Sequence, residues 1–352
     1  MRRIAMVLAV VISIALIAAG CGAKSAEQVV KDLDHVVSKL DSYEGMGKMT
    51  LYTGQQEQTY SVEVWYQNPH YYRIKLSNEQ NDISQIVLRN DEGVFVLTPH
   101  LNKMFRFQSD WPENSGQVYL FQSLAQSILM DADRVFTEEK DSYIFDVVAN
   151  YQNGMLSRQK VWLDKKTYAP QQVQVTDDNH NVVVAVSFSH FQFGKKFDKD
   201  SFDMQRNMTS WNLETMPTSA GVQGTPQGNA GGEQQANHQT FGIIEPEYTP
   251  EGVTLQDLRE ITLGGEKAVL LRYSGKYNYT IVESMPETKT VTSLAGTILD
   301  LGYTLGIVTG EEKGMRTLTW TYNGVEFRLS TGDLNQEEMI KIAQSVQGQV
   351  GK

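Results

Sequence analysis

Apolar side chains recur every three or four positions near the start of the chain, which predicts an amphipathic helix over about 26–40. Six of them lie on one stripe: Val29, Val30, Leu33, Val36, Val37 and Leu40. Ser25 stands directly before this segment as an N-cap, and Gln28 follows at the capping-box position. The cap and the stripe therefore agree on where the helix begins.

Alternation of apolar and polar residues follows, from about residue 49 to residue 193. In stretches such as 62–66 and 72–76 nearly every second residue is apolar, as in strands that bury one face. Turn-forming residues separate the stretches, among them Asn68-Pro69 and the segment 90–93. This pattern predicts a long antiparallel meander, which curls as it twists.

Helical spacing interrupts the meander once, over 117–130. The apolar positions of this segment are Val118, Phe121, Leu124, Ala125, Ile128 and Leu129. They predict an amphipathic helix inserted between strands, available to cover the curled sheet. Two interpretations stay open, a helix that fills a dry core and a lid over a cavity, and composition alone favours the filled core.

The composition changes at residues 212–240, where Gly, Gln, Asn, Thr, Ser and Pro dominate and no aromatic residue occurs. This predicts a flexible linker between a first domain, 22–211, and a smaller α+β domain, 241–352. The second domain alternates again and closes with a helix. That helix has Asn335 as its N-cap, Glu338 to complete the capping box, and Leu334 against Met339 as a hydrophobic staple.

The first 21 residues have the pattern of an export signal. Arg2 and Arg3 precede an apolar run over 4–17, which is short for a membrane span. Ala18-Ala19-Gly20-Cys21 then resembles a bacterial lipobox, which implies that Cys21 is lipidated. We therefore expect a lipid-anchored protein on the extracytoplasmic face of the cell membrane. An ordinary signal peptide that ends near a cysteine is the alternative.

Charge and residue content narrow the function classes. The chain of 352 residues has a net charge of −11, so it repels nucleic-acid phosphates and no nucleic-acid partner is expected. Cys21 is the only cysteine, which leaves no disulfide framework and no cysteine nucleophile. The six histidines are scattered.

From the motifs in the sequence we expect a protein that is not an enzyme and that binds no metal and no cofactor. Asp177-x-Asn179-x-Asn181 begins like a calcium loop, but Val182 occupies the required glycine position, so a polar turn is the better interpretation. An extracytoplasmic hydrolase whose catalytic set assembles only in three dimensions remains a distant alternative.

The order of motifs over residues 26–204 resembles the bacterial lipoprotein carriers LolA and LolB and the related sigma-factor regulator RseB. The best match is a spaced set of four residues, Trp65, Pro69, Tyr72 and Ile74. The stretch 86–107 looks like the family's strand, Asp-Gly-type turn, strand with a Pro and final strand. The stretch 160–193 looks like its late hairpins, and FDKDSFDM at 197–204 resembles its terminal strand. Similar anchored proteins occur in spore-forming Gram-positive bacteria, where some act in spore development and germination.

The resemblance implies a mainly β, α+β fold, in which a curved antiparallel sheet forms an incomplete β-barrel with a helical lid. It also implies a hydrophobic cavity that binds lipid acyl chains or lipoproteins without catalysis. The residues expected to line the cavity and lid are Val62, Val64, Tyr66, Tyr72, Ile74, Val96, Phe121, Leu124, Ile128 and Val184.

Two further functions stay open at this point. The linker and second domain are more than a simple carrier needs, which favours an RseB-like sensor or regulator that acts through an envelope protein partner. A purely structural envelope or spore factor with a filled core is the other.

Overall fold

The computed structural model describes residues 24–52, 57–78, 83–99, 103–107, 111, 117–151, 156–214, 243–285, 291–293, 296–311, 314–322 and 325–346. Cys21 and most of the predicted linker, residues 215–240, lie outside these ranges. The chain divides into two compact units, residues 1–39 and 40–352, and each is described by itself.

The first unit contains helix α2 (Ala26–Ser38). Its capping box is formed as predicted, because the Ser25 hydroxyl accepts from the Gln28 amide at 3.3 Å and the Gln28 side chain accepts from the Ser25 amide at 3.0 Å. Val29 and Leu33 of the predicted stripe are fully buried. The helix ends two residues before the predicted boundary at residue 40.

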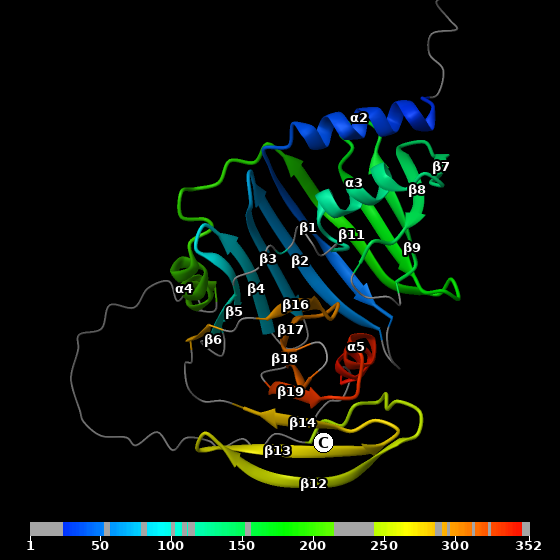
Figure 1. Ribbon diagram of the computed structural model, residues 1–352. Helices are drawn as coiled ribbons and strands as arrows, with labels where there is room; N and C mark the ends of the chain where they lie inside the picture. Colours follow the sequence, from blue (N-terminus) through cyan, green and yellow to red (C-terminus); the bar gives the residue numbers. More distant parts are fainter. Residues whose placement is uncertain are drawn as a thin grey trace, which may run out of the picture. The chain divides into compact units, whose positions relative to one another are not determined.

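The second unit contains a twelve-stranded sheet, in the order β15-β6-β5-β4-β3-β2-β1-β11-β10-β9-β8-β7 (Figure 1). Neighbouring strands are antiparallel except β15 and β6. The strands are β1 (Ser42–Leu51), β2 (Gln58–Gln67), β3 (Tyr71–Asn78), β4 (Ile83–Asn90), β5 (Gly93–Thr98), β6 (Lys103–Phe107), β7 (Val135–Glu138), β8 (Ser142–Val148), β9 (Arg158–Asp164), β10 (Pro170–Thr176), β11 (Val182–Phe193) and β15 (Val291–Ser293). In the described residues the edge strands β15 and β7 do not pair, so the sheet stays open. The predicted incomplete barrel is confirmed.

The two faces of this sheet are covered differently. We call the side that carries Tyr43, Tyr66 and Tyr72 the inner face, and the opposite side the outer face. Helix α3 (Phe121–Met130) packs on the inner face, through ring contacts from Phe121 to Tyr43. The helix between strands is therefore confirmed, although it begins four residues later than predicted.

Helix α4 (Met204–Glu214) covers one end of the outer face, where a core cluster forms from Ile86, Leu88, Phe95, Leu97 and Phe202. Met204 and Met208 pack against this cluster. The prediction of a terminal strand at 197–204 is wrong, because residues 199–202 form turns and the Asp203 carboxylate accepts from the Arg206 amide at 2.8 Å, which caps α4.

The second domain has a seven-stranded antiparallel sheet, in the order β12-β13-β14-β19-β18-β17-β16. Its elements are β12 (Val253–Leu263), β13 (Glu266–Gly275), β14 (Tyr279–Ser284), β16 (Thr297–Asp300), β17 (Leu305–Gly310), β18 (Arg316–Tyr322), β19 (Val325–Thr331) and helix α5 (Gln336–Ser345). The α+β character predicted for this domain is confirmed.

The N-terminal end of α5 agrees with the sequence in part. The Asn335 side chain accepts from the Glu338 amide at 2.8 Å, as an N-cap does. The Glu338 carboxylate accepts from the Tyr248 hydroxyl at 2.7 Å, so it ties the start of the domain to α5 instead of completing the box. Leu334 and Met339 are both fully buried, as a staple requires.

Candidate ligand-binding face

Seven of the predicted cavity residues come from strands and lie together on the inner face. The register of β2 and β3 places Tyr66 opposite Tyr72 and Val64 opposite Ile74. Because side chains alternate across a strand, these pairs point to the same side of the sheet. None of the seven is more than 6% exposed: Val62, Val64, Tyr66, Tyr72, Ile74, Val96 and Val184.

The three predicted lid residues, Phe121, Leu124 and Ile128, lie on one stripe of α3 and are fully buried. The Phe121 ring lies 4.9 Å from the Phe193 ring, 6.0 Å from Phe191 and 6.2 Å from Tyr43, measured between centroids. The helix therefore sits directly on β1 and β11, and its side chains occupy the inner face.

One polar link crosses this apolar layer. The Tyr43 hydroxyl donates to Gln122 Oε1 at 2.8 Å, and Gln122 Nε2 donates to the Tyr72 hydroxyl at 3.1 Å. Burial, and then the nearby Tyr72, raise the pKa of Tyr43 well above its ordinary value, so this hydroxyl keeps its proton. Gln122 orients α3 on the sheet, and sequence reasoning missed it because a glutamine beside an apolar stripe has no distinguishing spacing.

The second domain contacts the other end of the same face. Gln85 of β4 accepts from the Thr304 hydroxyl at 2.8 Å and from the Leu305 amide at 3.1 Å. At Gly302 a Cβ would lie 3.4 Å from the Leu51 side chain, and its φ of +86° favours glycine. Leu51 and Gln85 lie on the inner face, so the turn before β17 covers the end of the face away from α3.

Asp300 lies in the same contact region. Its carboxylate accepts from the Gly302 amide at 2.7 Å, and burial raises its pKa to about 6. Burial, and then Asp300, raise the pKa of Tyr119 and of Tyr151. Asp300 of the second domain therefore acts electrostatically on two tyrosines of the first domain. Helix α3 and the second domain each cover part of the inner face.

The other described residues give little indication of metal binding. Over the described ranges, no group of three or more His, Cys, Asp and Glu residues could hold a metal ion. The Asp177 carboxylate accepts from the amides of Asn179 at 2.9 Å and Asn181 at 2.8 Å, so this segment is the polar turn that the sequence favoured. In the part of the chain that the structure describes, no helix is long and apolar enough to span a bilayer.

Comparison with known proteins shows which family the chain belongs to. Residues 1–202, more than half of its length, match the family described as sporulation protein YdcC-like. The chain belongs to the sporulation protein YdcC-like family. The sporulation protein YdcC of Bacillus subtilis (strain 168) is 40% identical over 341 residues, which cover 96% of this chain and 95% of that protein. Residues 243–346 match a second family, described as a domain of unknown function, DUF4367.

The matches among solved structures have low sequence identity and low TM-scores. The MucA/MucB complex of Pseudomonas aeruginosa contains a chain 13% identical, with a TM-score of 0.31 and coverage of 89% of this chain and 98% of that one. A LolA superfamily protein from Nitrosomonas europaea is 9% identical, with a TM-score of 0.29 and coverage of 52% and 99%.

Proposed function

We propose that this protein is a non-catalytic lipoprotein of sporulating cells, anchored to the extracytoplasmic face of the cell membrane, whose inner face binds an acyl chain of a lipid or lipoprotein. The observation that carries the proposal is the cover of the inner face. In the part of the chain that the structure describes, one end of this broad apolar sheet is covered by a ten-residue helix, α3, and not by a second sheet. Such a cover can leave while the strands keep their backbone hydrogen bonds.

An exchange of α3 for an acyl chain is energetically balanced. Burial of Phe121, Leu124 and Ile128 stabilises the closed state by about 5–9 kcal/mol, at roughly 1.5–3 kcal/mol for each fully buried side chain. A palmitoyl chain contributes about 11 kcal/mol, at roughly 0.8 kcal/mol for each of about fourteen methylenes. The difference is a few kcal/mol before the cost of ordering the chain. Binding is therefore favourable for long chains and unfavourable for short ones.

Chain length supplies the test of the acyl site. Residues 22–352 should take up palmitate, and affinity should fall about fifteenfold from palmitate to myristate, because two methylenes are lost. Displacement of a fluorescent palmitoyl probe measures this series. Equal affinity for palmitate, myristate and octanoate, or no uptake of any of them, contradicts the proposal.

The proposed anchor is Cys21, which the lipobox-like Ala18-Ala19-Gly20 precedes. A lipid anchor keeps the inner face close to the membrane, where acyl chains and lipoproteins are. Metabolic labelling with an alkyne analogue of palmitate should label the wild-type chain in a bacterial host. The Cys21→Ala variant should remain unlabelled and leave the membrane fraction. A membrane-bound, unlabelled wild-type chain would contradict lipidation.

A second candidate function is regulation through an envelope protein partner. The contact of Gln85 with Thr304 favours it, because this contact lets the second domain respond to whether the inner face is occupied. A stable one-to-one complex with a single membrane protein, purified without bound lipid, would favour this function over acyl binding.

A further inference from the structure

A row of side chains crosses the outer face of the first sheet at right angles to the strands. The strand register of β10, β11, β1, β2 and β3 places five residues in line: Gln172 is opposite Ser187, Ser187 opposite Lys48, Lys48 opposite Ser61, and Ser61 opposite Ser77. Trp162 of β9 lies opposite Gln172 and ends the series. We call this set the polar row: Trp162, Gln172, Ser187, Lys48, Ser61 and Ser77.

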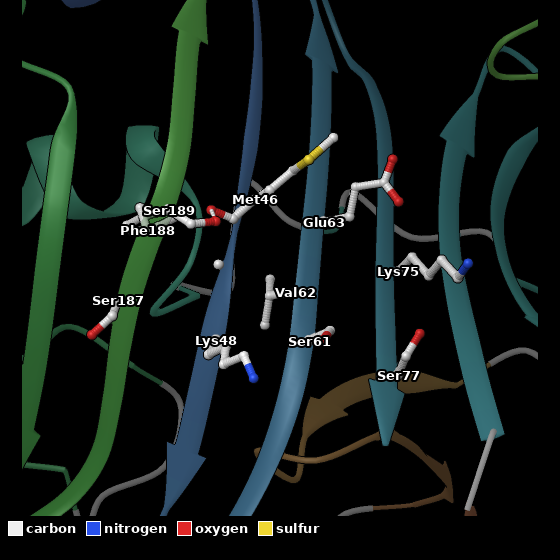
Figure 2. A pocket seen from close by; sticks show the side chains of 11 residues that line it. Met46, Lys48, Ser61, Val62, Glu63, Lys75, Ser77, Ser187, Phe188 and Ser189 are labelled. Carbon is white, nitrogen blue, oxygen red and sulfur yellow. Dashed lines mark hydrogen bonds between the residues drawn. The ribbon is translucent and has the colours of Figure 1, made fainter. Parts of the chain in front are cut away.

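Part of the polar row lies in a groove of about 520 Å³, which is within the range of ligand sites in proteins. Figure 2 shows Lys48, Ser61 and Ser77 on adjacent strands of this groove, with Glu63 and Lys75 beside them. Ser61 and Ser77 are half-buried in the groove, whereas Lys48 and Ser187 are exposed. This part of the row therefore lies in a groove with polar side chains and is not flat.

A β-bulge shapes one wall of the groove. Met46 pairs with His190 whereas Gly47 pairs with Phe188, so Ser189 is the extra residue of β11. The Ser189 hydroxyl donates to the Met46 carbonyl at 3.2 Å, which fixes the bulge. Bulges kink a strand and increase its local twist, and here the kink adjoins the groove.

Lysines and arginines outnumber the carboxylates around the polar row, although the whole chain has a net charge of −11. Glu63 lies 3.2 Å from the Arg73 guanidinium, and Asp146 lies 2.7 Å from the Arg158 guanidinium, so each carboxylate lies beside an arginine. Lys48 and Lys75 line the groove, and Lys160 lies 5.9 Å from the centroid of the Trp162 ring. This local field attracts an anionic ligand.

We propose that the polar row binds an acidic polysaccharide, whose chain lies across the strands. Hydroxyl and amide groups pair with sugar hydroxyls, the lysines pair with carboxylate or phosphate groups, and the Trp162 ring offers an apolar face to a sugar ring. From β9 to β3 the row spans about 24 Å, at roughly 4.8 Å for each strand spacing, which suits a linear polymer. This site lies on the opposite side of the sheet from the proposed acyl site and does not depend on it.

Two other anionic partners fit less well. A bilayer surface is flat, whereas part of the row lies in a groove. An acidic peptide that adds to a sheet needs an open edge, whereas the row crosses β10, β11, β1, β2 and β3 in the interior of the sheet.

The experiment is calorimetric titration of residues 22–352 with oligomers of polygalacturonate. Methyl-esterified oligomers, poly-L-glutamate and phosphatidylglycerol vesicles are the comparisons. Saturable binding of the acidic oligomer is expected, at least tenfold tighter than binding of the ester or of either comparison polyanion. Lys48→Gln should weaken binding about tenfold, the loss expected for one charge-assisted hydrogen bond.

Matched variants separate the site from general charge and from misfolding. Lys267→Gln makes the same charge change on an exposed residue of the second domain and should leave the affinity unchanged. Trp162→Phe should keep binding, and Trp162→Ala should reduce it about tenfold. No saturable binding of polygalacturonate, equal binding of poly-L-glutamate or vesicles, or an equal effect of Lys48→Gln and Lys267→Gln would overturn the proposal.

Discussion

Replacement of Ile128 by alanine tests whether α3 and an acyl chain compete for the inner face. Ile128 is fully buried on α3, so its truncation removes contacts that hold the helix closed. We expect the free energy of unfolding to fall by about 2–5 kcal/mol, the usual range for a buried isoleucine cut to alanine.

The same change should strengthen the binding of palmitate. In the bound state α3 has already left the face, so the variant loses these contacts only when the ligand is absent. If about 2 kcal/mol of the lost stability belongs to the closure of α3, affinity rises about thirtyfold. A variant that is less stable yet binds more tightly is the signature of a displaced cover.

Urea denaturation and displacement of a fluorescent palmitoyl probe measure the two effects on one preparation. Leu88→Ala is the matched control, because Leu88 is fully buried in the cluster on the outer face, beneath α4. It should lose similar stability with no gain in affinity. An Ile128→Ala variant that is destabilised but binds palmitate no better than the wild type would refute the exchange of α3 for the chain.

Three further predictions address other contacts. Gln122→Ala should lower the free energy of unfolding by about 1–3 kcal/mol, and by clearly less in a Tyr43→Phe background, since the buried Tyr43 hydroxyl then has no bond to lose. Gln85→Ala should separate urea unfolding into two transitions, because the Thr304 and Leu305 donors lose their acceptor; a single unchanged transition would argue against this contact. Burial raises the pKa of Glu283 from 4.5 to about 7, so the folded state holds a proton that the unfolded state releases. Stability should therefore fall by up to about 3 kcal/mol as pH rises through this window, and Glu283→Gln should remove that part of the dependence, whereas an unchanged pH profile would contradict it.

Sequence patterns predicted the helices and caps that depend on residues a few positions apart. The Ser25 cap, the Asn335 cap and the stripe of α3 each depend on residues a few positions apart, and each is present. The start of β1 was missed, because Gly45 and Gly47 interrupt the alternation. At Gly45 a Cβ would lie 2.9 Å from the Phe191 ring, so the glycine makes room for an aromatic residue far away in the sequence.

The features that the sequence did not predict depend on contacts between segments that are distant in the sequence. Thr304 donates to Gln85 across 219 positions, and neither residue belongs to a recognisable motif. Helix α4 was missed because its residues are mostly polar, and its last three, 212–214, correct the start of the predicted linker. Its packing depends on Met204 and Met208 meeting a cluster on the outer face, which only the folded sheet creates.

The central claim is that the inner face exchanges its cover for an acyl chain. Native mass spectrometry of residues 22–352, followed by organic extraction, tests it most directly. We expect a discrete added mass that extracts as lipid, or that appears when palmitate or a lipopeptide is added. A clean mass of the free protein, unchanged by either ligand, would contradict the account and leave the inner face as a permanently filled core.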